Sequence, residues 1–394
     1  MKITHIHIER FRGFQNEDFE VGSQLTAIAG QNGTQKSTLL AIVTQTFTLK
    51  AEDPMRAEKP LCGGSYISAF KDKFRLSPTF DRPKGHEWTI SFDAGVDDFT
   101  VESIKRTGDP NVRFWKKGAR QEGDGYLSFP TIFLSLKRLV PMAEEAKIIT
   151  DDTLLTPEEL NEFKQLHNKI LIVQTPISSA TTITSKNKQS IGVSTELYDW
   201  NQNSMGQDNL GKIILALFSF KRLHDKYPRQ YKGGILAIDE MDATMYPASQ
   251  VELLRILRRY ASKLNLQILF TTHSMSLLKA MDDLVQEVNK KEETANQVKV
   301  LYLKKVDDKI AIKQGVNFKG IQLDLNVVAE GNNRKKNKIT VYTEDKENIL
   351  FVKAILKTKA SVLDFVDVTL PCSTLMELVT KRVPAFRYPY SIVI

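Results

Sequence analysis

The sequence predicts an α/β protein, and three observations support this fold class. Short apolar strands alternate with amphipathic helices along most of the chain, which is the pattern of a sheet covered by helices. A glycine-containing segment, 30–38, separates a buried strand from a helix. After about residue 315 a second α/β pattern begins. We therefore expect a large unit with a mixed sheet and a helical insertion, followed by a smaller α/β unit.

The composition is ordinary for a globular protein, with 41% hydrophobic and 26% charged residues in a chain of 394. No apolar run approaches the roughly 18 residues that span a bilayer, and the N-terminus lacks a secretory signal, so we expect no membrane association. The two cysteines, Cys62 and Cys372, lie far apart, which favours a reducing, cytoplasmic setting. The net charge of +8 favours nucleic acid as a partner, although many proteins are mildly basic without one.

Periodicity and end signals predict the elements of the large unit. Thr156 and Pro157 form a good helix start, because threonine caps a helix N-terminus and proline suits its first position. In chain order, we expect a strand pair over 3–21 with its turn at Arg12 and Gly13, strand 25–29, helix 37–47, strand 88–92 within an irregular stretch of about 50–125, strand 131–136, helix 156–171, a mobile loop at 175–190, helix 210–223, strand 234–238, helix 250–264 and strand 266–270.

The remaining chain predicts a linker and a partial second domain. Residues 331–338 are polar and basic, and we place a linker over 316–338 between a domain at 1–315, with its insertion at about 50–200, and a domain at 339–394. Because the sequence stops on an apolar strand, we expect a longer natural protein. The predicted elements are strand 339–343, helix 346–356, strand 366–370, helix 373–379 and strand 390–394.

The first motif is the segment between the strand at 25–29 and the helix at 37–47, which is the context of a phosphate-binding P-loop. Backbone N–H groups of such a loop surround a triphosphate. Lys36 would place its ammonium beside the β- and γ-phosphates, and the Ser37 hydroxyl would bind Mg²⁺. The motif predicts ATP and Mg²⁺ as cofactors, with the nucleotide-binding residues Gly30, Asn32, Gly33, Thr34, Gln35, Lys36, Ser37 and Thr38.

Gln35 departs from the P-loop pattern, which places a glycine before the lysine. Glycine there allows the backbone to approach the phosphate closely. A side chain fits if the local φ is negative, but it could weaken binding or slow turnover.

The second motif is the apolar strand 234–238, which ends in Asp239 and Glu240 in the Walker B arrangement. Asp239 would hold Mg²⁺, directly or through water, and Glu240 would polarise the attacking water as general base. A strand that ends in Asp-Glu is ambiguous alone, but together with the P-loop it predicts a site for ATP hydrolysis.

The third and fourth motifs contain His273, at the end of the strand 266–270, and the run from Ser204 to Gln207 before an apolar helix. With the first two motifs they resemble ABC-type ATPases. There a histidine in this place contacts the γ-phosphate, and a Ser and a Gly at a helix N-terminus bind the γ-phosphate held by a second subunit. The resemblance assigns Glu240, His273 and Lys36 as catalytic residues and Ser204, Gly206 and Gln207 as nucleotide-binding residues. A structural histidine and an ordinary helix cap are the alternatives.

Two further features are less specific. The segment 242–247 lies where the D-loop of these ATPases is found, and no glutamine can be assigned to their Q-loop. Arg138 is either a phosphate or nucleic-acid contact or an exposed arginine on a solvated turn.

The motif order resembles the RecF, SMC-like and OLD (overcoming lysogenization defect) group of ATPases over residues 1 to about 315, and the opening segment 8–14 is similar to the first hairpin of that group. The segment 339–344, followed by a helix, resembles the start of a Toprim domain, whose first strand ends in a metal-binding glutamate, here Glu344. Asp345 stands where Toprim domains usually have glycine, and a surface residue is the alternative for Glu344. An ATPase followed by Toprim is the layout of OLD-family nucleases, including those of the anti-phage systems Gabija and some retrons.

The resemblance implies an OLD-like ATPase that pairs head-to-tail through its ATP sites, as a homodimer or higher homo-oligomer, and gates a metal-dependent Toprim nuclease in antiviral defence. The implied partners are nucleic acid and a defence-system protein or reverse transcriptase. Since the Toprim aspartates are absent, we expect little DNA cleavage by this chain alone. Two alternatives stay open: a DNA-repair or chromosome-type clamp without nuclease activity, and an ATP-bound scaffold with negligible turnover.

Overall fold

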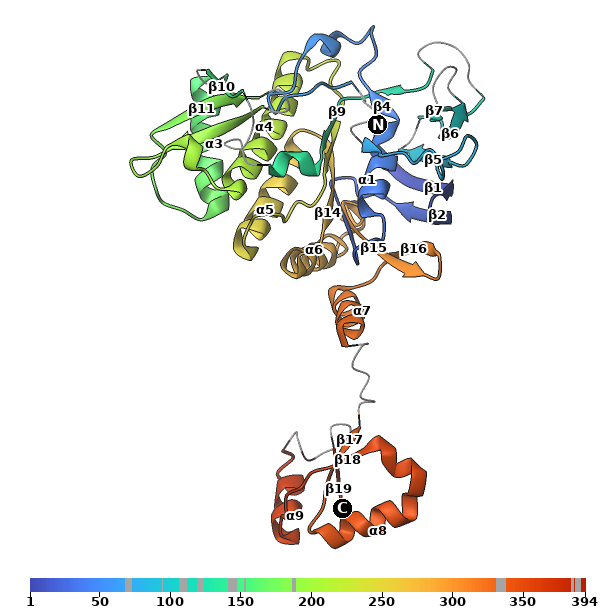
Figure 1. Cartoon of the computed structure of the whole chain (residues 1–394). Helices are drawn as coiled ribbons and strands as arrows, with labels where there is room; N and C mark the ends of the chain where they lie inside the picture. The colour runs from blue at the N-terminus through green and yellow to red at the C-terminus, as the bar shows by residue number, and fades with distance from the viewer. Residues whose placement is uncertain are drawn as a thin grey trace. The chain divides into compact units, whose positions relative to one another are not determined.

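The structure is a computed structural model in which the chain divides into two compact units, 1–322 and 323–394. Each unit is described by itself. Figure 1 shows the elements of both. The described residues are 1–67, 73–93, 95–105, 112–118, 124–140, 147–151, 154–185, 189–330, 338–383, 386 and 391–394.

The first unit is built on a six-stranded sheet with the order β16-β15-β3-β14-β13-β9. All neighbouring strands run parallel except β15 and β16, which form an antiparallel hairpin, so the sheet is mixed as the sequence predicts. The strands are β3 (Leu25–Gly30), β9 (Thr131–Leu134), β13 (Gly234–Ile238), β14 (Leu266–Thr272), β15 (Val298–Val306) and β16 (Lys309–Gln314).

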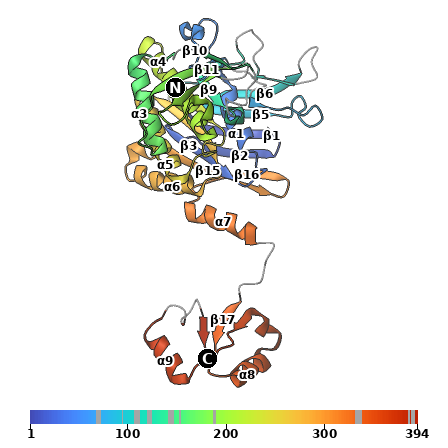
Figure 2. The same cartoon turned by 60° about the vertical axis from the view of Figure 1, so that its left-hand side comes forward.

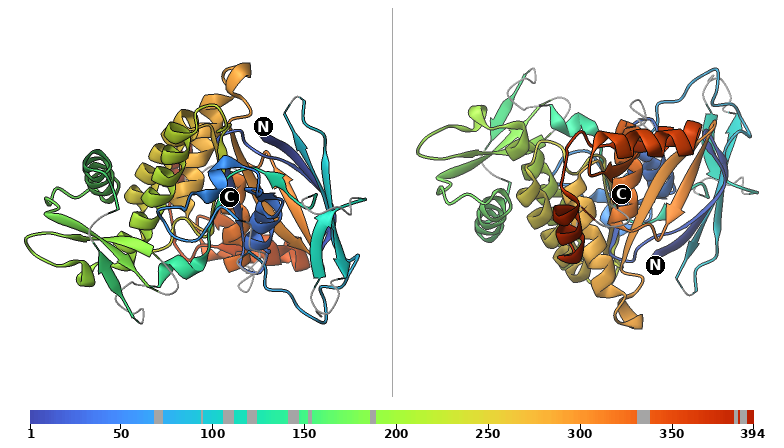
Figure 3. Two further views of the ribbon diagram at one scale, coloured as in Figure 1. Left: turned by 90° about the horizontal axis from the view of Figure 1, so that it is seen from above. Right: turned by 90° about the horizontal axis from the view of Figure 1, so that it is seen from below.

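Side chains from this sheet enter two separate hydrophobic cores. In β13, Leu236 and Ile238 belong to one core, while Ile235 and Ala237 belong to the other, because successive residues of a strand point to opposite faces. The first core contains residues of three long helices, and Figure 3 shows these helices side by side along the sheet. They are α4 (Met205–Lys226), α5 (Pro247–Lys263) and α6 (Met275–Val288).

The second core lies between the six-stranded sheet and a five-stranded antiparallel sheet with the order β2-β1-β5-β6-β7. Helix α1 (Lys36–Gln45) contributes five consecutive buried residues, 39–43, to this core, because it is enclosed by both sheets. The strands are β1 (Ile3–Phe11), β2 (Phe14–Glu20), β5 (Glu87–Phe92), β6 (Phe99–Lys105) and β7 (Val112–Lys116), and a two-stranded pair is formed by β4 (Phe47–Thr48) and β8 (Leu127–Ser128).

The stretch 50–125 is therefore less irregular than its composition indicates. Of its three longer strands only β5 is predicted from the sequence. Strands β6 and β7 are short and carry charged residues on their exposed positions, but they bury Phe99 and Phe114 against the aromatic ring of Trp88 and its neighbours.

The insertion contains β10 (Ile149–Asp151), α3 (Pro157–Leu171), β11 (Ser179–Thr184) and β12 (Gln189–Ser194). Helix α3 begins as predicted, with Thr156 and Glu159 in a reciprocal capping box. The expected mobile loop at 175–190 is wrong, because β11 and β12 pair antiparallel across it. Its threonines are β-branched and suit a strand, and Ala180 and Ile183 are buried. Residues 186–188 lie outside the described residues.

The segment 316–338, predicted as a linker, contains α7 (Phe318–Glu330), in which Ile321 is 1% exposed. Regular apolar spacing over these residues accounts for the helix. Residues 331–337, the core of the predicted basic linker, lie outside the described residues.

The second unit is a three-stranded parallel sheet with the order β18-β17-β19 and one helix on each side (Figure 2). Its elements are β17 (Ile339–Tyr342), α8 (Lys346–Leu356), β18 (Leu363–Phe365), α9 (Cys372–Thr380) and β19 (Ser391–Val393). The strand expected at 366–370 is wrong in position, because Leu363 provides the buried apolar residue beside β17. Of the predicted last strand, Tyr390 lies outside the described residues.

Among the described residues, no helix is both long enough and apolar enough to cross a bilayer.

Candidate nucleotide site

The loop between β3 and α1 has a shape that its sequence requires. Gly30 has φ +153°, and a Cβ atom at this position would lie 2.5 Å from the carbonyl oxygen of Leu303 in the neighbouring strand β15. Only glycine fits there. Thr34 is buried and closes the turn, since its hydroxyl donates to the carbonyl oxygen of Gln31 over 2.8 Å. Asn32 and Gly33 are exposed at the tip of the loop.

Three chain segments meet at the carboxylate of Asp239. Ser37 in the first turn of α1 donates its hydroxyl hydrogen to Asp239 Oδ1 over 2.8 Å. Thr271, near the end of β14, donates to the same oxygen over 2.7 Å, and its hydroxyl oxygen accepts the backbone N–H of Glu240 over 2.6 Å. The carboxyl ends of parallel strands lie at one edge of a sheet, which is where α/β proteins bind ligands.

Lys36 folds back over the loop. Its ammonium group donates to the carbonyl oxygens of Gly30, over 3.1 Å, and Gln31, over 3.0 Å, and the residue is 7% exposed. Burial lowers the pKa of this ammonium, while the carboxylates of Glu240, Asp239 and Asp242 raise it by a smaller amount. Among the described residues Lys36 forms no ion pair, and a buried cation of this kind is suited to an anionic ligand.

Glu240 and His273 lie on the same edge of the sheet. Glu240 is partly exposed and has φ +49°, a left-handed backbone that is uncommon for a residue with a side chain. Partial burial lowers the pKa of His273 and the Lys36 ammonium lowers it further, against smaller opposite effects of Glu240, Asp242 and Asp239. The imidazole is therefore neutral at neutral pH and can act as a hydrogen-bond acceptor or donor.

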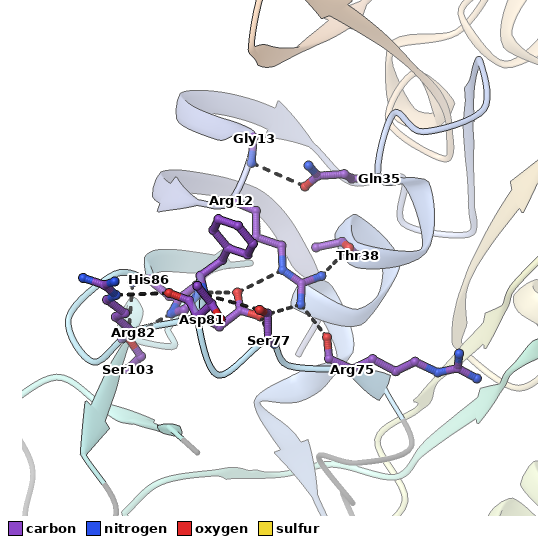
Figure 4. A network of polar contacts seen from close by, with 12 residues as sticks. Arg12, Gly13, Gln35, Thr38, Arg75, Ser77, Asp81, Arg82, His86 and Ser103 are labelled. Atoms are coloured by element: carbon purple, nitrogen blue, oxygen red, sulfur yellow. Dashed lines mark hydrogen bonds and ion pairs between the residues drawn. The ribbon is translucent and has the colours of Figure 1, made fainter. Parts of the chain in front are cut away.

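Gln35 occupies the glycine position of the P-loop pattern with φ +61°. The expectation that a side chain there requires a negative φ is wrong, since glutamine adopts the left-handed conformation itself. Its Oε1 accepts a long 3.4 Å hydrogen bond from the backbone N–H of Gly13 in the β1–β2 turn. The side chain points toward the β1–β2 turn (Figure 4), and the backbone of Gln35 keeps the left-handed conformation that glycine commonly takes.

The same turn contributes Arg12, which sequence reasoning did not assign to the site. Arg12 donates from Nη1 to the hydroxyl of Thr38 over 3.3 Å and forms a two-pronged ion pair with Asp81 (Figure 4). Burial opposes ionisation of Asp81, but hydrogen bonds from Arg12, from the backbone of Ser77 and from His86 outweigh it and lower its pKa to about 2. The network holds a guanidinium beside the P-loop helix.

The Ser204–Gln207 run forms the N-terminus of α4. Ser204 caps the helix, and Gln207 completes the capping box by accepting the backbone N–H of Ser204 over 2.8 Å. A Cβ on Gly206 would lie 2.6 Å from the carbonyl oxygen of Thr244, so the helix start packs tightly on the segment that follows Glu240. Within the described part of the chain, no hydrogen bond or ion pair joins this helix terminus to residues 30–38.

Arg138 differs from both sequence interpretations, because it is 3% exposed and contacts the protein backbone. It lies in the short helical turn after β9 and donates to the carbonyl oxygens of Asp239, over 2.5 Å, and Glu240, over 2.7 Å. Its Nε donates to Asn209 Oδ1 over 2.7 Å. Asn209 in turn donates to the carbonyl oxygen of Ala243 over 3.0 Å.

Glu344 belongs to the second unit and directly follows Thr343 at the carboxyl end of the central strand β17. Its Oε1 accepts the backbone N–H of Cys372, at the start of α9, over 3.3 Å. Asp345, the departure from the Toprim pattern, caps α8 by accepting from the backbone of Asn348 over 2.8 Å. No group of three or more His, Cys, Asp or Glu side chains suited to a metal occurs among the described residues.

The donors present fit a magnesium–nucleotide complex at the first unit. Ser37 and Asp239 present a hydroxyl and a carboxylate oxygen 2.8 Å apart, and Mg²⁺ prefers oxygen ligands supplied by one or two side chains plus substrate phosphates. Lys36, Ser37, Asp239, Glu240 and His273 thus converge, whereas the helix terminus with Ser204 forms a separate group and Glu344 belongs to the other unit.

Comparison with known proteins gives one family match. Residues 135–278 match the AAA_15 family, described as an AAA ATPase domain. The matched residues include Ser204, Asp239, Glu240 and His273, while the P-loop lies outside them. No curated protein matches the chain.

Among solved structures, similarity is found to the SMC head domain from Thermotoga maritima, with 14% identity and a TM-score of 0.44, covering 80% of this chain and 100% of that one. The Smc head domain with an extended coiled coil bound to ScpA from Pyrococcus furiosus gives 13% identity and a TM-score of 0.45, covering 83% and 99%. The recombination mediator protein RecF-ATP gives 13% identity and a TM-score of 0.38, covering 79% and 97%.

Proposed function

We propose that this chain binds ATP with Mg²⁺ at the P-loop and hydrolyses it. The observation that carries the proposal is the convergence of Ser37 and Thr271 on one oxygen of Asp239. This joins the start of the P-loop helix to the ends of two neighbouring parallel strands. The AAA ATPase match over residues 135–278 supports the same reaction class.

The residues have distinct roles in this proposal. Lys36 neutralises phosphate charge, and backbone N–H groups at the start of α1 hold the phosphates. Ser37 and Asp239 hold Mg²⁺, which when bound neutralises the charge that develops on the leaving phosphate. Glu240 polarises the attacking water as general base, and neutral His273 orients it near the γ-phosphate.

The position of Ser204 and Gly206 favours a second copy of the chain as partner. A helix N-terminus carries the positive end of the helix dipole and N–H groups without a partner inside the helix, which suit an anion. Since that terminus packs on Thr244, and no hydrogen bond between described residues joins it to the P-loop of its own chain, we propose that it meets the γ-phosphate held by the partner. ATP would then favour a closed head-to-tail dimer and hydrolysis would favour its opening, as a shift in populations.

The second unit is the proposed target of this cycle. Its three-stranded order, β18-β17-β19, places Glu344 beside the central strand at a topological switch point, where α/β sheets bind ligands. We propose that the ATPase gates a Toprim-type, metal-dependent nuclease of which Glu344 is one ligand, in antiviral defence, with nucleic acid and a defence-system protein or reverse transcriptase as partners. An ATP-driven DNA-repair or chromosome-type clamp without cleavage is equally compatible with the observations.

Calorimetry on the full chain tests the central claim. We expect saturable heat of ATP binding that requires Mg²⁺ and is lost in Lys36→Ala, while the surface variant Lys279→Ala binds as the unaltered chain does. No heat of binding in the unaltered chain with ATP and Mg²⁺ would refute the proposal.

Metal binding at Glu344 and retention of DNA separate the two downstream roles. Because little cleavage is expected of this chain alone, the nuclease role is tested by calorimetry of Mn²⁺ with the ATP-free full chain, in which Glu344→Gln should remove part of the binding heat. A clamp would retain intact circular DNA in an ATP-dependent manner and be indifferent to that substitution.

A further inference from the structure

Arg138 is a buried cation that links its own turn to two segments remote in the sequence. Its guanidinium donates to Ser135 and Leu134 at the end of β9, over 3.1 and 3.3 Å, and to the carbonyl oxygens of Asp239 and Glu240 after β13. A planar guanidinium can hold two adjacent acceptors in fixed geometry, which a lysine ammonium cannot. It therefore fixes the direction in which the chain leaves β13.

The backbone that Arg138 holds is strained. Glu240 has φ +49°, and a side chain in this region costs on the order of 1–2 kcal/mol unless the surroundings impose it. The carbonyl oxygen of the same residue accepts from Arg138 over 2.7 Å, and its N–H donates to Thr271 over 2.6 Å. These two hydrogen bonds fix the peptide groups before and after the Glu240 Cα atom. They therefore set the direction in which the Glu240 side chain leaves the backbone.

Asn209 connects Arg138, and through it the backbone of Glu240, to helix α4. It is 0% exposed and lies in the second turn of α4, which Ser204 caps. Its Oδ1 accepts from Arg138, while its Nδ2 donates to the carbonyl oxygen of Ala243 and, over 3.4 Å, to the hydroxyl of Thr244. One amide thus contacts both the guanidinium that holds Glu240 and the segment that packs under Gly206.

Among the described residues, the buried charge of Arg138 has no ion-pair partner. Burial lowers the pKa of the Arg138 guanidinium to about 10, partly offset by Asp239, Glu240 and Asp242. Its hydrogen bonds to carbonyl and amide oxygens offset the cost of burial, and an apolar side chain would leave these acceptors without a donor. A guanidinium that satisfies acceptors in two candidate functional segments is suited to positioning them.

We propose that Arg138 and Asn209 are positioning residues that couple the N-terminus of α4 to the carboxylate of Glu240. When a partner-held γ-phosphate binds at Ser204 and Gly206, a shift of α4 passes through Asn209 and Arg138 to the backbone of Glu240 in the same chain. The proposal rests on the proposed ATPase function and deepens it, because it makes each site's general base responsive to occupation of the opposite site.

The test compares Arg138→Lys and Asn209→Ala with the unaltered chain and with the surface control Arg255→Lys. Three quantities are measured on the full chain: ATP affinity by calorimetry, kcat and KM by phosphate release, and ATP-induced dimer formation by analytical ultracentrifugation in a Glu240→Gln background. Because a misplaced catalytic group can cost about a hundredfold in rate, we expect kcat to fall about ten- to a hundredfold in either variant. KM and ATP affinity should stay within about threefold, and dimer formation should be unchanged.

The double variant gives the decisive result. If the two residues act as one connection, combining the substitutions lowers kcat no further than the more severe single change, whereas independent effects multiply. The proposal is overturned if kcat is unchanged in Asn209→Ala, or if turnover falls only in step with ATP affinity or dimer formation. Should Arg138→Lys fail to fold, Asn209→Ala alone decides, since it removes only one amide. If the unaltered chain neither binds nor hydrolyses ATP, it is the proposed function that fails and not the coupling.

Discussion

The hydroxyl of Ser37 lies 2.8 Å from Oδ1 of Asp239, although the two residues are 202 positions apart in the sequence. One follows the loop after β3 and the other follows β13, and β14 lies between these strands in the sheet. Its residue Thr271 fills the intervening position and donates to the same oxygen. The contact therefore depends on the register of three strands, and it provides the oxygen pair on which the proposed magnesium site depends.

Glu240→Gln should abolish turnover while ATP still binds. Removing a general base costs about 10²- to 10⁴-fold in rate, and glutamine keeps the shape and the backbone contacts with Arg138 and Thr271. Phosphate release and calorimetry measure the two effects. Glu287→Gln, which changes a surface carboxylate 61% exposed, is the control. Unchanged phosphate release in Glu240→Gln would contradict the assignment.

Asp239→Asn should remove the magnesium dependence of ATP binding. The amide oxygen still accepts from Ser37 and Thr271, so we expect the free energy of unfolding to change by less than about 1 kcal/mol. Loss of the carboxylate should weaken Mg²⁺-dependent ATP affinity about tenfold or more, or about 1.4 kcal/mol. Calorimetry with and without Mg²⁺ checks this, with the exposed Asp225→Asn as control. Retained magnesium dependence would exclude Asp239 as a ligand.

Gln35→Gly should stabilise the chain by about 1 kcal/mol, because it relieves a side chain at φ +61° and loses only a 3.4 Å hydrogen bond to Gly13. Turnover should stay within about threefold, since the loop already has the backbone that glycine favours. Urea unfolding and phosphate release measure both. Asp307→Gly, at φ +54° in the β15–β16 turn, is the matched control for strain relief. A large gain in turnover would instead favour the scaffold alternative.

The burial of His167 should lower the free energy of unfolding of the chain in mild acid. Burial lowers its pKa from 6.5 to about 4, and its Nε2 has no hydrogen-bond partner in the described structure. Below pH 6.5 the unfolded chain binds a proton that the folded chain does not, so stability falls between pH 6.5 and about 4. Each pH unit between the two pKa values is worth about 1.4 kcal/mol, which gives about 3 kcal/mol in total.

Urea unfolding of His167→Phe between pH 7 and pH 4.5 tests this effect. Phenylalanine can keep the stacking on Phe163, so the variant should lose less stability on acidification than the unaltered chain. The exposed His224→Phe should retain the full acid sensitivity. If the free energy of unfolding falls by the same amount with pH in His167→Phe and in the unaltered chain, His167 does not contribute to the acid sensitivity.

Asp81→Asn should cost about 3 kcal/mol of stability at pH 7, because it leaves Arg12 without its buried carboxylate partner. Since the pKa of Asp81 is lowered to about 2, the stabilisation is present above the unfolded pKa of about 4 and is lost as the pH falls toward 2. Urea unfolding at pH 7 and pH 3 measures the difference, which should narrow at the lower pH. Asp93→Asn, at an exposed ion pair, should cost less than about 1 kcal/mol.

Local sequence patterns predicted those helices and strands whose own residues show an apolar run, a regular period or a capping motif. The apolar run of β13 and the capping residues of α3 are found where the sequence places them. The hairpin of β11 and β12 was missed because its serines and threonines read as a loop, and only the pairing of the two strands and the packing of β12 against α4 identify them as strands. The hairpin of β15 and β16 was also missed, although Ile310 and Ile312 alternate with other residues in the pattern of a strand after the turn at Asp307.

The same distinction applies to the candidate site. Lys36, Ser37, Asp239 and Glu240 stand in short motifs, so their types and spacing identify them. Arg12, Thr271 and Asn209 contact partners remote in sequence. Arg138 was predicted as either a phosphate or nucleic-acid contact or an exposed arginine, because an arginine after a strand has no local sign of burial. Thr271, near the end of a largely apolar strand, has a local signal of this kind, whereas Asn209 follows Gln207 and Asp208 in the polar start of α4 and has none.

The placement of β3 between β14 and β15 has a consequence for synthesis on the ribosome. β3 ends at Gly30, yet one of its neighbours begins at Leu266 and the other at Val298. At about 5–20 residues per second, translation of both neighbouring strands takes on the order of tens of seconds after this fully buried strand has been made. The nascent chain must be kept from aggregating over that interval, and the nucleotide loop attached to β3 acquires its final shape only after three quarters of the chain have emerged.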